Sequence, residues 1–193
     1  MGGQNISGKS GRTEVTDSEW TVLRITKAAD WVSEGNFFVL QEDALEDDQG
    51  LSTIRIDPSR NLGEEVRQAV RRRETEPGRD GKTLKVAKSH ILVQIDQRLR
   101  DAIEPAGVRI SLLQDDSQMW HVIIAETGES GTSDEFSVSA GSAIRKNPDL
   151  IKLFNREGEQ LTQEQAASMI RETKWRQKAD LERFLARARK KPP

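Results

Sequence analysis

The chain has 193 residues, a length that suits one domain of ordinary size, with or without extensions. Hydrophobic residues make up 34% and charged residues 32% of it, against roughly 45–50% and about 25% in typical globular domains, so we expect part of the chain to lie outside any core. The net charge of −2 and the absence of cysteine exclude a uniformly basic nucleic-acid-binding coat, disulfides, thiolate catalysis and cysteine-ligated metal centres.

The first 18 residues mix Gly, Ser and charged residues without apolar periodicity, so they predict a flexible N-terminal lead. Residues 3–10 match the letters of a phosphate-binding loop, G-x-x-x-x-G-K-[ST], but no strand leads into them and no amphipathic helix follows, so we assign them no such role. The chain has no apolar signal-peptide core and no apolar run of about 20 residues, and we expect a soluble cytoplasmic protein.

Apolar patterning starts at Trp20 and predicts alternating short elements up to Ile56. In chain order these are a strand over 20–25, a helical turn over 28–32, an apolar run over 37–40, an acidic loop over 42–48 and a strand over 52–56. A helix from Asn61 to Arg73 follows, because Asn61 and Glu64 fit a capping box and apolar residues recur at helical spacing. The glycines and proline of residues 76–81 predict a hinge.

The stretch from Thr83 to Glu126 has the clearest globular pattern. We expect strands around 84–86 and over 90–95, a short helix over 96–103, and an antiparallel hairpin whose strands are 108–113 and 119–125. Residues 127–134 then predict a Gly/Ser-rich loop, followed by a weak strand or turn around 136–138.

Asn147-Pro148 predicts the start of a short amphipathic helix that includes residues 149–154. Residues 161–191 lack Gly and Pro and are rich in helix formers, which predicts one long helix or two joined near 173–177. The chain as a whole predicts one α+β domain over 19–157, with a small, mostly antiparallel sheet and two or three short helices. A long basic amphipathic helix in an extension over 158–193 would follow it.

The C-terminal helix has two distinct faces. At about 100° per residue, its apolar residues fall within roughly 60° of Leu181; they are Ala167, Ile170, Phe184, Leu185 and Ala188. Its cations Arg176, Arg183, Arg187 and Lys190 lie on the opposite face. Residues 171–191 carry nine basic and three acidic residues, a net charge of +6 that leaves −8 on the rest of the chain. The helix could therefore dock by one face and present the other to an anionic partner.

This charge asymmetry leads to the main functional hypothesis. We expect a non-catalytic regulatory or accessory protein whose globular domain recognises a protein partner and whose basic helix binds nucleic acid or an acidic partner. The candidate binding residues are Arg176, Arg183, Arg187 and Lys190, with Trp175 able to stack on a base and Arg71, Arg72 and Arg73 extending the surface if the two helices lie side by side. A solvated face that only keeps the chain soluble is the simpler interpretation, and an anionic membrane surface is a weaker one.

Two other classes stay open. Asp149 with Glu172 and Lys174 resembles a metal-dependent nuclease pattern, so a phosphodiesterase is one alternative. His121 could act with Asp115 or Asp116 as metal ligands or as a base and its orienting group, but no nucleophile is spaced to complete a catalytic set, and we expect no cofactor. A structural subunit, whose long helix docks on a copy of itself or on a larger assembly, is the other alternative.

Overall fold

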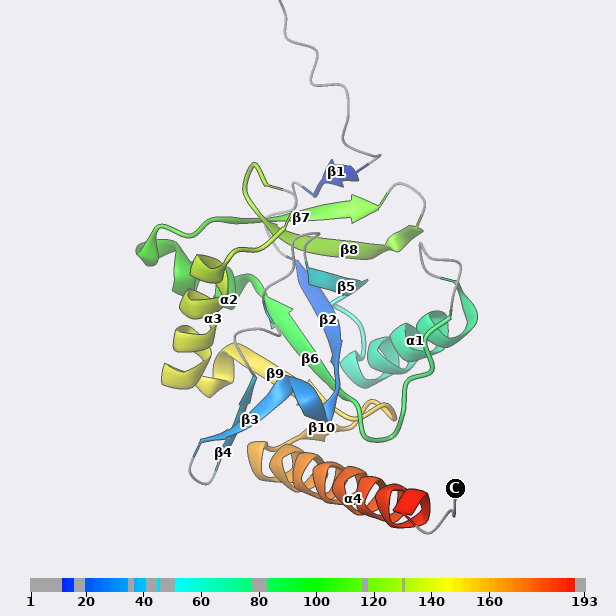
Figure 1. Ribbon diagram of the computed structural model, residues 1–193. Coiled ribbons are helices and arrows are strands. Elements are labelled where there is room, and N and C mark those ends of the chain that lie inside the picture. The colour runs from blue at the N-terminus through cyan, green and yellow to red at the C-terminus, as the bar shows by residue number, and fades with distance from the viewer. Residues whose placement is uncertain are drawn as a thin grey trace, which may run out of the picture.

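Figure 1 shows the fold of the chain in a computed structural model. It describes residues 12–15, 20–34, 37–40, 45, 51–77, 83–115, 118–129 and 131–189. The phosphate-loop-like residues 3–10, the acidic residues between 42 and 48, Asp116 and Lys190 lie outside the described residues. Among the helices of these ranges, none combines the length and the apolar character that crossing a lipid bilayer demands.

One antiparallel sheet organises the fold. Its strands have the order β1-β7-β8-β5-β2-β6-β9-β10. Their bounds are β1 Arg12–Glu14, β2 Thr21–Thr26, β5 Leu51–Ile56, β6 Ile91–Asp96, β7 Ile110–Asp115, β8 Gln118–Glu126, β9 Ile151–Phe154 and β10 Gln160–Leu161. The α+β class and the hairpin of β7 and β8 are confirmed, but the sheet has eight strands and is not the small one predicted.

Both faces of the central strands are buried. Successive side chains on a strand point to opposite faces, and the neighbours Val22 and Leu23 on β2 accordingly belong to two separate core clusters. The larger cluster includes residues of α2 (Gln97–Ile103) and α3 (Asp134–Lys146), and the smaller one includes residues of α1 (Leu62–Thr75). Figure 1 shows α2 and α3 on one side of the sheet and α1 on the other. The sheet is therefore the middle layer of the molecule.

The helices start where the sequence supplies polar caps. The caps are Asn61 for α1, Asp96 for α2 and Ser133 for α3, and each accepts a backbone N–H bond from the first turn of its helix. The Glu64 carboxylate, which a capping box would direct back to the Asn61 amide, instead pairs with Arg67 at 2.6 Å.

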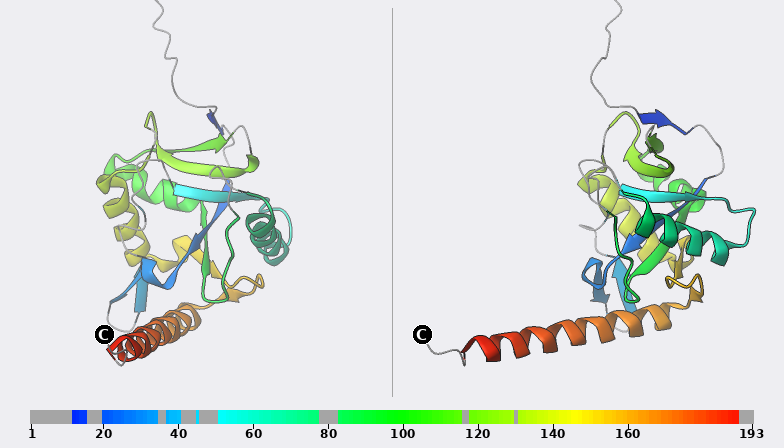
Figure 2. Two further views of the ribbon diagram at one scale, coloured as in Figure 1. Left: turned by 45° about the vertical axis from the view of Figure 1, so that its right-hand side comes forward. Right: turned by 90° about the vertical axis from the view of Figure 1, so that its right-hand side faces the viewer.

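The last helix, α4 (Gln163–Arg189), is a single helix that belongs only in part to the body. It lies beneath a separate hairpin of β3 (Trp31–Glu34) and β4 (Phe37–Leu40). Ala166, Ala167 and Ile170 on its first turns are buried, and Ala166 and Ile170 belong to the larger core cluster. The right-hand view of Figure 2 shows the rest of α4 extending well beyond the body.

Three elements differ from the prediction. We expected a loop that ends at residue 134 and a weak strand or turn around 136–138, but residues 134–146 form helix α3. The helix forms because Phe136, Ala140 and Ile144 recur every fourth residue and are buried in the core. Residues 151–154, expected to be helical, form strand β9, which pairs with β6. Residues 83–87, where a strand was expected, form none.

The domain limits also shift. Strand β1 lies inside the segment 1–18 that we predicted to be a flexible lead, and it pairs with β7 through Thr13↔Gln114. At the other end, the buried turns of α4 lie inside the predicted extension 158–193. The globular part thus takes in residues on both sides of 19–157.

Candidate functional site

The most exposed apolar surface of the described residues lies on the projecting part of α4. We call residues 175–189 the arm. Lys174 is the last residue before it, and its Nζ donates to the Trp31 carbonyl on β3, so this contact marks the point where the helix leaves the body. Beyond it the large apolar side chains are uncovered: Trp175 is 70% exposed, Leu181 57%, Phe184 67% and Leu185 45%.

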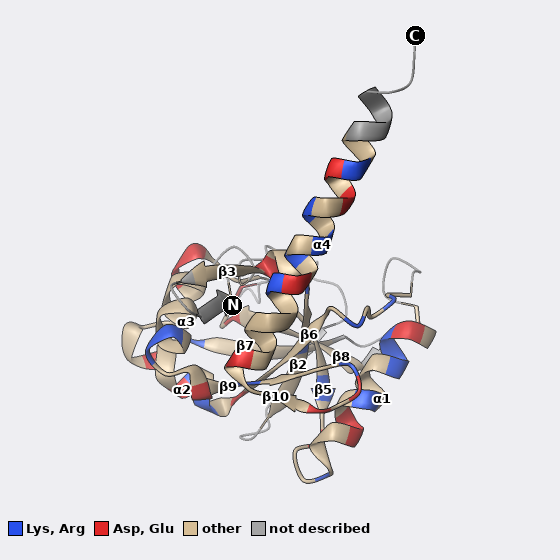
Figure 3. Cartoon of the chain, turned by 90° about the horizontal axis from the view of Figure 1, so that it is seen from below, with Lys and Arg blue, Asp and Glu red and all other residues tan. Residues whose placement is uncertain are grey.

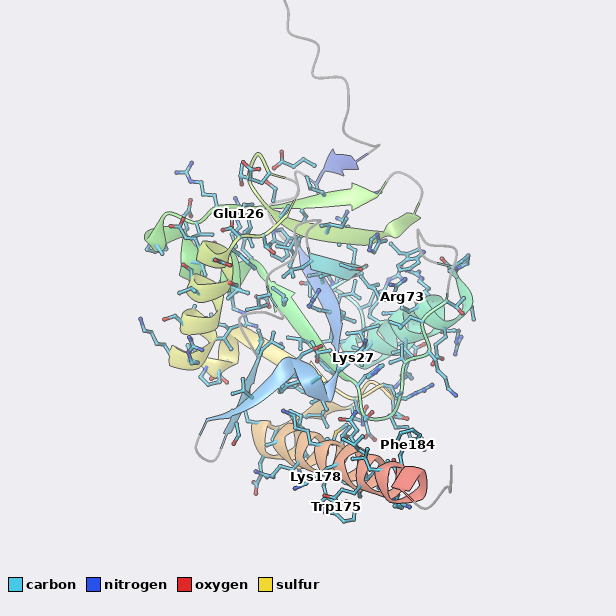
Figure 4. All side chains as sticks on the ribbon, viewed as in Figure 1. Lys27, Arg73, Glu126, Trp175, Lys178 and Phe184 are labelled. Atoms are coloured by element: carbon cyan, nitrogen blue, oxygen red, sulfur yellow. The ribbon has the colours of Figure 1, made fainter. Side chains whose placement is uncertain are left out.

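The arm continues the same apolar stripe by which α4 packs on the body. Ile170 is 1% exposed, whereas Leu181, Phe184 and Leu185, which lie on the same face of the helix, have no comparable cover. With Ala188, these residues occupy positions i, i+3, i+4 and i+7, the spacing by which a docking helix anchors in a groove. In Figure 4, Phe184 and Trp175 lie on opposite sides of α4, so Trp175 is not part of the stripe.

Two of the cations predicted on the arm are engaged in ion pairs along the helix. Arg176 pairs with Glu172, at 2.5 Å, and Arg183 pairs with Asp180, at 3.1 Å. All four side chains are at least 59% exposed, so these pairs are weak and can exchange for another anion. The side chain of Arg187 lies outside the described part of the chain, as does the whole of Lys190.

The arginines of α1 do not join the arm in one surface. Figures 2 and 3 show the arm pointing away from the body and away from α1. The three neighbours face different surroundings: Arg71 is exposed, Arg72 lines a large hollow of about 670 Å³, and Arg73 lines a smaller hollow of about 280 Å³. The side-by-side arrangement of the two helices that would have merged the predicted residues is therefore not present.

The larger hollow lies between α1 and the ends of β2, β5 and β8. Trp20 and Trp120 are its aromatic walls. Among the described residues, its charged lining is balanced, with three arginines and three carboxylates: Arg55, Arg60, Arg72, Asp57, Glu65 and Glu76. Arg60 pairs with Asp57 at 3.2 Å, and hydrogen bonds from the Ser59 hydroxyl and amide lower the pKa of the Asp57 carboxyl. The described lining residues therefore carry no net charge that would favour a cation or an anion.

A serine–histidine contact that the sequence reasoning missed joins β5 to β8. The Ser52 Oγ and the His121 Nε2 lie 2.8 Å apart. The register places Ile54 opposite His121, so Ser52 is a diagonal neighbour of His121 on the same face. A nucleophilic serine usually sits at a turn that lifts it out of the sheet. Because Ser52 lies within a regular strand, we assign the contact a structural role that links the two strands.

The residues of the nuclease-like pattern are engaged separately. Glu172 pairs with Arg176, Lys174 contacts the Trp31 carbonyl, and Asp149 lies in a 3₁₀ turn over Pro148–Leu150. In the part of the chain that the structure describes, no group of three His, Cys, Asp or Glu residues could hold a metal ion. Asp116 and the side chain of Asp115, expected near His121, fall outside that part.

Comparisons with known proteins give no further guide to the site. The sequence matches no protein-family model, and the searches of curated proteins and of solved structures found no match.

Proposed function

We propose that the chain is a binding protein whose arm docks as a helix into an apolar groove on an acidic protein partner. The observation that carries this proposal is the uncovered stripe of Leu181, Phe184 and Leu185 on a helix whose preceding turns are packed in the core. Exposed apolar patches with polar surroundings mark interaction surfaces, and helices that dock in grooves use this spacing of anchors.

A nucleic-acid partner explains less of the arm. Phosphate contacts need cations, and they do not need an apolar stripe. Arg176 and Arg183 could release their carboxylates and contact phosphates, but three large apolar side chains would then stay in water. A groove on a protein accounts for the stripe and for the basic surroundings together.

Pairing of two arms alone is too small to account for the stripe. Three half-exposed side chains offer on the order of 100 Å² each, so two arms would bury about 600 Å² in total, below the roughly 1,200 Å² of a stable interface. A groove that also covers the flanks of the helix buries more of the same segment. We therefore infer a different protein as the partner.

The charge of the arm indicates an acidic rim on that groove. Residues 175–189 contain five basic and two acidic residues. Lys178, which lies at the edge of the stripe, is exposed and has no ion pair within the described residues. A carboxylate of the partner opposite Lys178 would complete this contact and steer association.

Quantitative affinity isolation tests the proposal. The full chain and its variants Leu181→Asp and Phe184→Asp are immobilised and compared for the proteins they retain from cells of the source organism, with Val138→Asp as the matched control. Val138 is 52% exposed on α3, so Val138→Asp removes an apolar side chain from the surface without changing the arm. We expect one acidic protein to be retained by the wild type and by Val138→Asp, and at least about tenfold less of it by the arm variants.

Two results would contradict the proposal. One is a retained set of proteins that is the same for the arm variants and the wild type. The other is retention that nuclease treatment abolishes and that Arg176→Ala and Arg183→Ala weaken while Phe184→Asp does not, because that pattern identifies a nucleic-acid partner.

A further inference from the structure

Trp175 is an exposed aromatic side chain of the arm that the apolar stripe does not include. It is the most exposed of the large apolar side chains that the structure describes, at 70%. Figure 4 shows it on the opposite side of α4 from Phe184, and the nine positions that separate the two correspond to half a turn around the axis. Tryptophan is among the residues most enriched at the energetic centres of interfaces. A groove that covers the stripe alone leaves this side chain in water.

Trp175 and the stripe are connected by one ridge along the arm. The ridge consists of residues at intervals of three: Trp175, Lys178, Leu181 and Phe184. Such a row forms a continuous ridge on a helix surface. Each step turns it by about 60°, so it sweeps over half of the helix surface from Trp175 to Phe184. All four side chains are exposed. A surface that covers the whole ridge must therefore embrace half of the circumference of the arm.

The other half of the helix surface carries charges that pair with each other. Two ion pairs lie on it: Arg176 with Glu172, and Arg183 with Asp180. Their side chains are between 59% and 73% exposed. This half can stay in water when a partner covers the ridge, so docking along the ridge leaves both pairs intact.

Lys178 is the cation of the ridge. It stands between Trp175 and Leu181, and it makes no ion pair with Glu182, one turn further on, or with any other residue that the structure describes. A groove that takes apolar side chains on both sides of Lys178 also removes water from its ammonium group. A charge that loses its water needs a counter-charge. Lys178 therefore requires a carboxylate in the floor of the groove.

The area of the arm also favours a deep groove. The exposed parts of the three large side chains of the stripe offer on the order of 100 Å² each, and Trp175 adds on the order of 150 Å². A standard interface buries about 800 Å² on each partner. The stripe alone supplies less than half of this area, whereas Trp175 and the stem of Lys178 bring the arm past half of it, before the flanks of the helix are covered.

We propose that the acidic protein partner holds the arm in a deep cleft. One wall of the cleft covers Leu181 and Phe184, the other has a pocket for Trp175, and a carboxylate between them pairs with Lys178. This inference rests on the proposed function and adds the shape of the partner's site and the residue that sets the register. A slide of the arm by one turn would place Glu182 opposite the same carboxylate, and the repulsion between like charges disfavours that register.

Competition binding tests the pocket for Trp175. The probe is the protein that the immobilised full chain retains and that its Leu181→Asp variant does not, and soluble full-chain variants compete for it. We expect Trp175→Ala to raise the competitor concentration at half displacement by at least about 30-fold. Asp180→Ala is the control from the charged half, where the side chain is 73% exposed, and it should change this concentration by less than about twofold.

Lys178→Met tests the carboxylate, because methionine keeps an apolar stem and removes the charge. We expect binding to weaken by at least about tenfold, since the partner's carboxylate is left without a counter-charge. In a cleft without that carboxylate, the added apolar surface would leave binding unchanged or make it tighter. Glu182→Ala is the matched control and should bind at least as tightly as the wild type. Lys178 and Glu182 are both exposed, so neither substitution removes a core contact.

Photo-crosslinking tests the second wall independently. A photoreactive phenylalanine analogue at position 175 of the full chain should crosslink to the same protein as one at position 184, but to a different segment of it. The same analogue at position 180, on the charged half, should give little of this product.

The outcomes separate the cleft from the proposed function. If Leu181→Asp retains the same proteins as the wild type, both are refuted. If Leu181→Asp loses the partner but Trp175→Ala competes as well as the wild type, the cleft is refuted and a shallow groove over the stripe remains. Unchanged or tighter binding of Lys178→Met, or equal weakening by Glu182→Ala, would refute the partner's carboxylate. Crosslinks from position 175 only to nucleic acid or to a second copy of the chain would also overturn the proposal.

Discussion

The division of α4 into a packed part and a free arm predicts opposite outcomes for two substitutions on the same stripe. Ile170 is 1% exposed and lies in the larger core cluster, whereas Phe184 is 67% exposed. Replacing a buried isoleucine by alanine costs about 2–5 kcal/mol, from lost transfer free energy and from the cavity left behind. We therefore expect Ile170→Ala to lower the free energy of unfolding by about 3 kcal/mol.

We expect Phe184→Ala to change the free energy of unfolding by less than about 0.5 kcal/mol, because the removal of an exposed side chain costs the fold little and alanine is the better helix former. The measurement is urea unfolding followed by circular dichroism, with melting temperatures as a second readout. A loss of about 3 kcal/mol corresponds to a fall of roughly 6–12 °C for a chain of this size.

The control is Val138→Ala, which truncates an exposed apolar residue on α3 and should also change stability by less than about 0.5 kcal/mol. A loss of more than about 1.5 kcal/mol for Phe184→Ala would refute the reasoning, since it would mean that the arm packs on the body in solution.

Three further predictions concern the body. Thr26→Val should destabilise the fold by about 1–3 kcal/mol in urea unfolding, because the Thr26 hydroxyl accepts the Trp31 indole N–H at 3.0 Å in a buried site and valine leaves that donor unsatisfied. Gly158→Ala should cost more than about 2 kcal/mol, since Gly158 has φ +81° and its Cβ would overlap the Gly63 carbonyl oxygen. Burial is the main cause of the lowered pKa of His90, so this histidine binds a proton more readily in the unfolded state than in the folded one. The free energy of unfolding should therefore fall as the pH drops from the ordinary histidine pKa of 6.5 through the lower pKa of the folded state. His90→Asn should remove this part of the pH dependence.

Each of these predictions has a result that contradicts it. Thr26→Ser, which keeps the hydroxyl, should recover most of the loss, and an equal loss for both variants would show that the hydroxyl is not the cause. For Gly158→Ala, unchanged stability would mean that the close approach to Gly63 is not required. For His90, an NMR titration that gives a pKa at or above 6.5 would remove the basis of the pH effect.

The sequence predicts the elements whose signals are local. The hairpin of β7 and β8 follows from two β-rich runs on either side of a turn composition, and α1 follows from its cap and its apolar spacing. In these segments the local preference and the tertiary environment agree, so no information from the rest of the chain is needed.

The elements predicted wrongly are those that tertiary packing decides. Strand β9 has Leu153 in one core cluster and Phe154 in the other, and a run that is apolar on both sides cannot be told from a helical turn by its pattern. For α3, the fourfold spacing of Phe136, Ala140 and Ile144 after the cap Ser133 was a usable signal, but the many Ser and Gly residues before it favoured a loop.

The candidate site was predictable in composition but not in arrangement. A helical wheel places Ile170 and Phe184 on one face of α4, and it contains no information about where the body ends and the arm begins. The grouping of Arg24, Lys27 and Arg73 in one hollow depends on the packing of α1 against β2, which brings together residues almost 50 positions apart in the chain.

Site-specific photo-crosslinking tests the role of the arm most directly. A photoreactive phenylalanine analogue is placed at position 184 of the full chain in cells, with position 138 as the control site, and the crosslinked products are identified. We predict one protein product from position 184, absent from position 138 and reduced when Leu181→Asp is added. Crosslinks from position 184 only to nucleic acid, or the same products from both positions, would contradict the proposed docking of the arm.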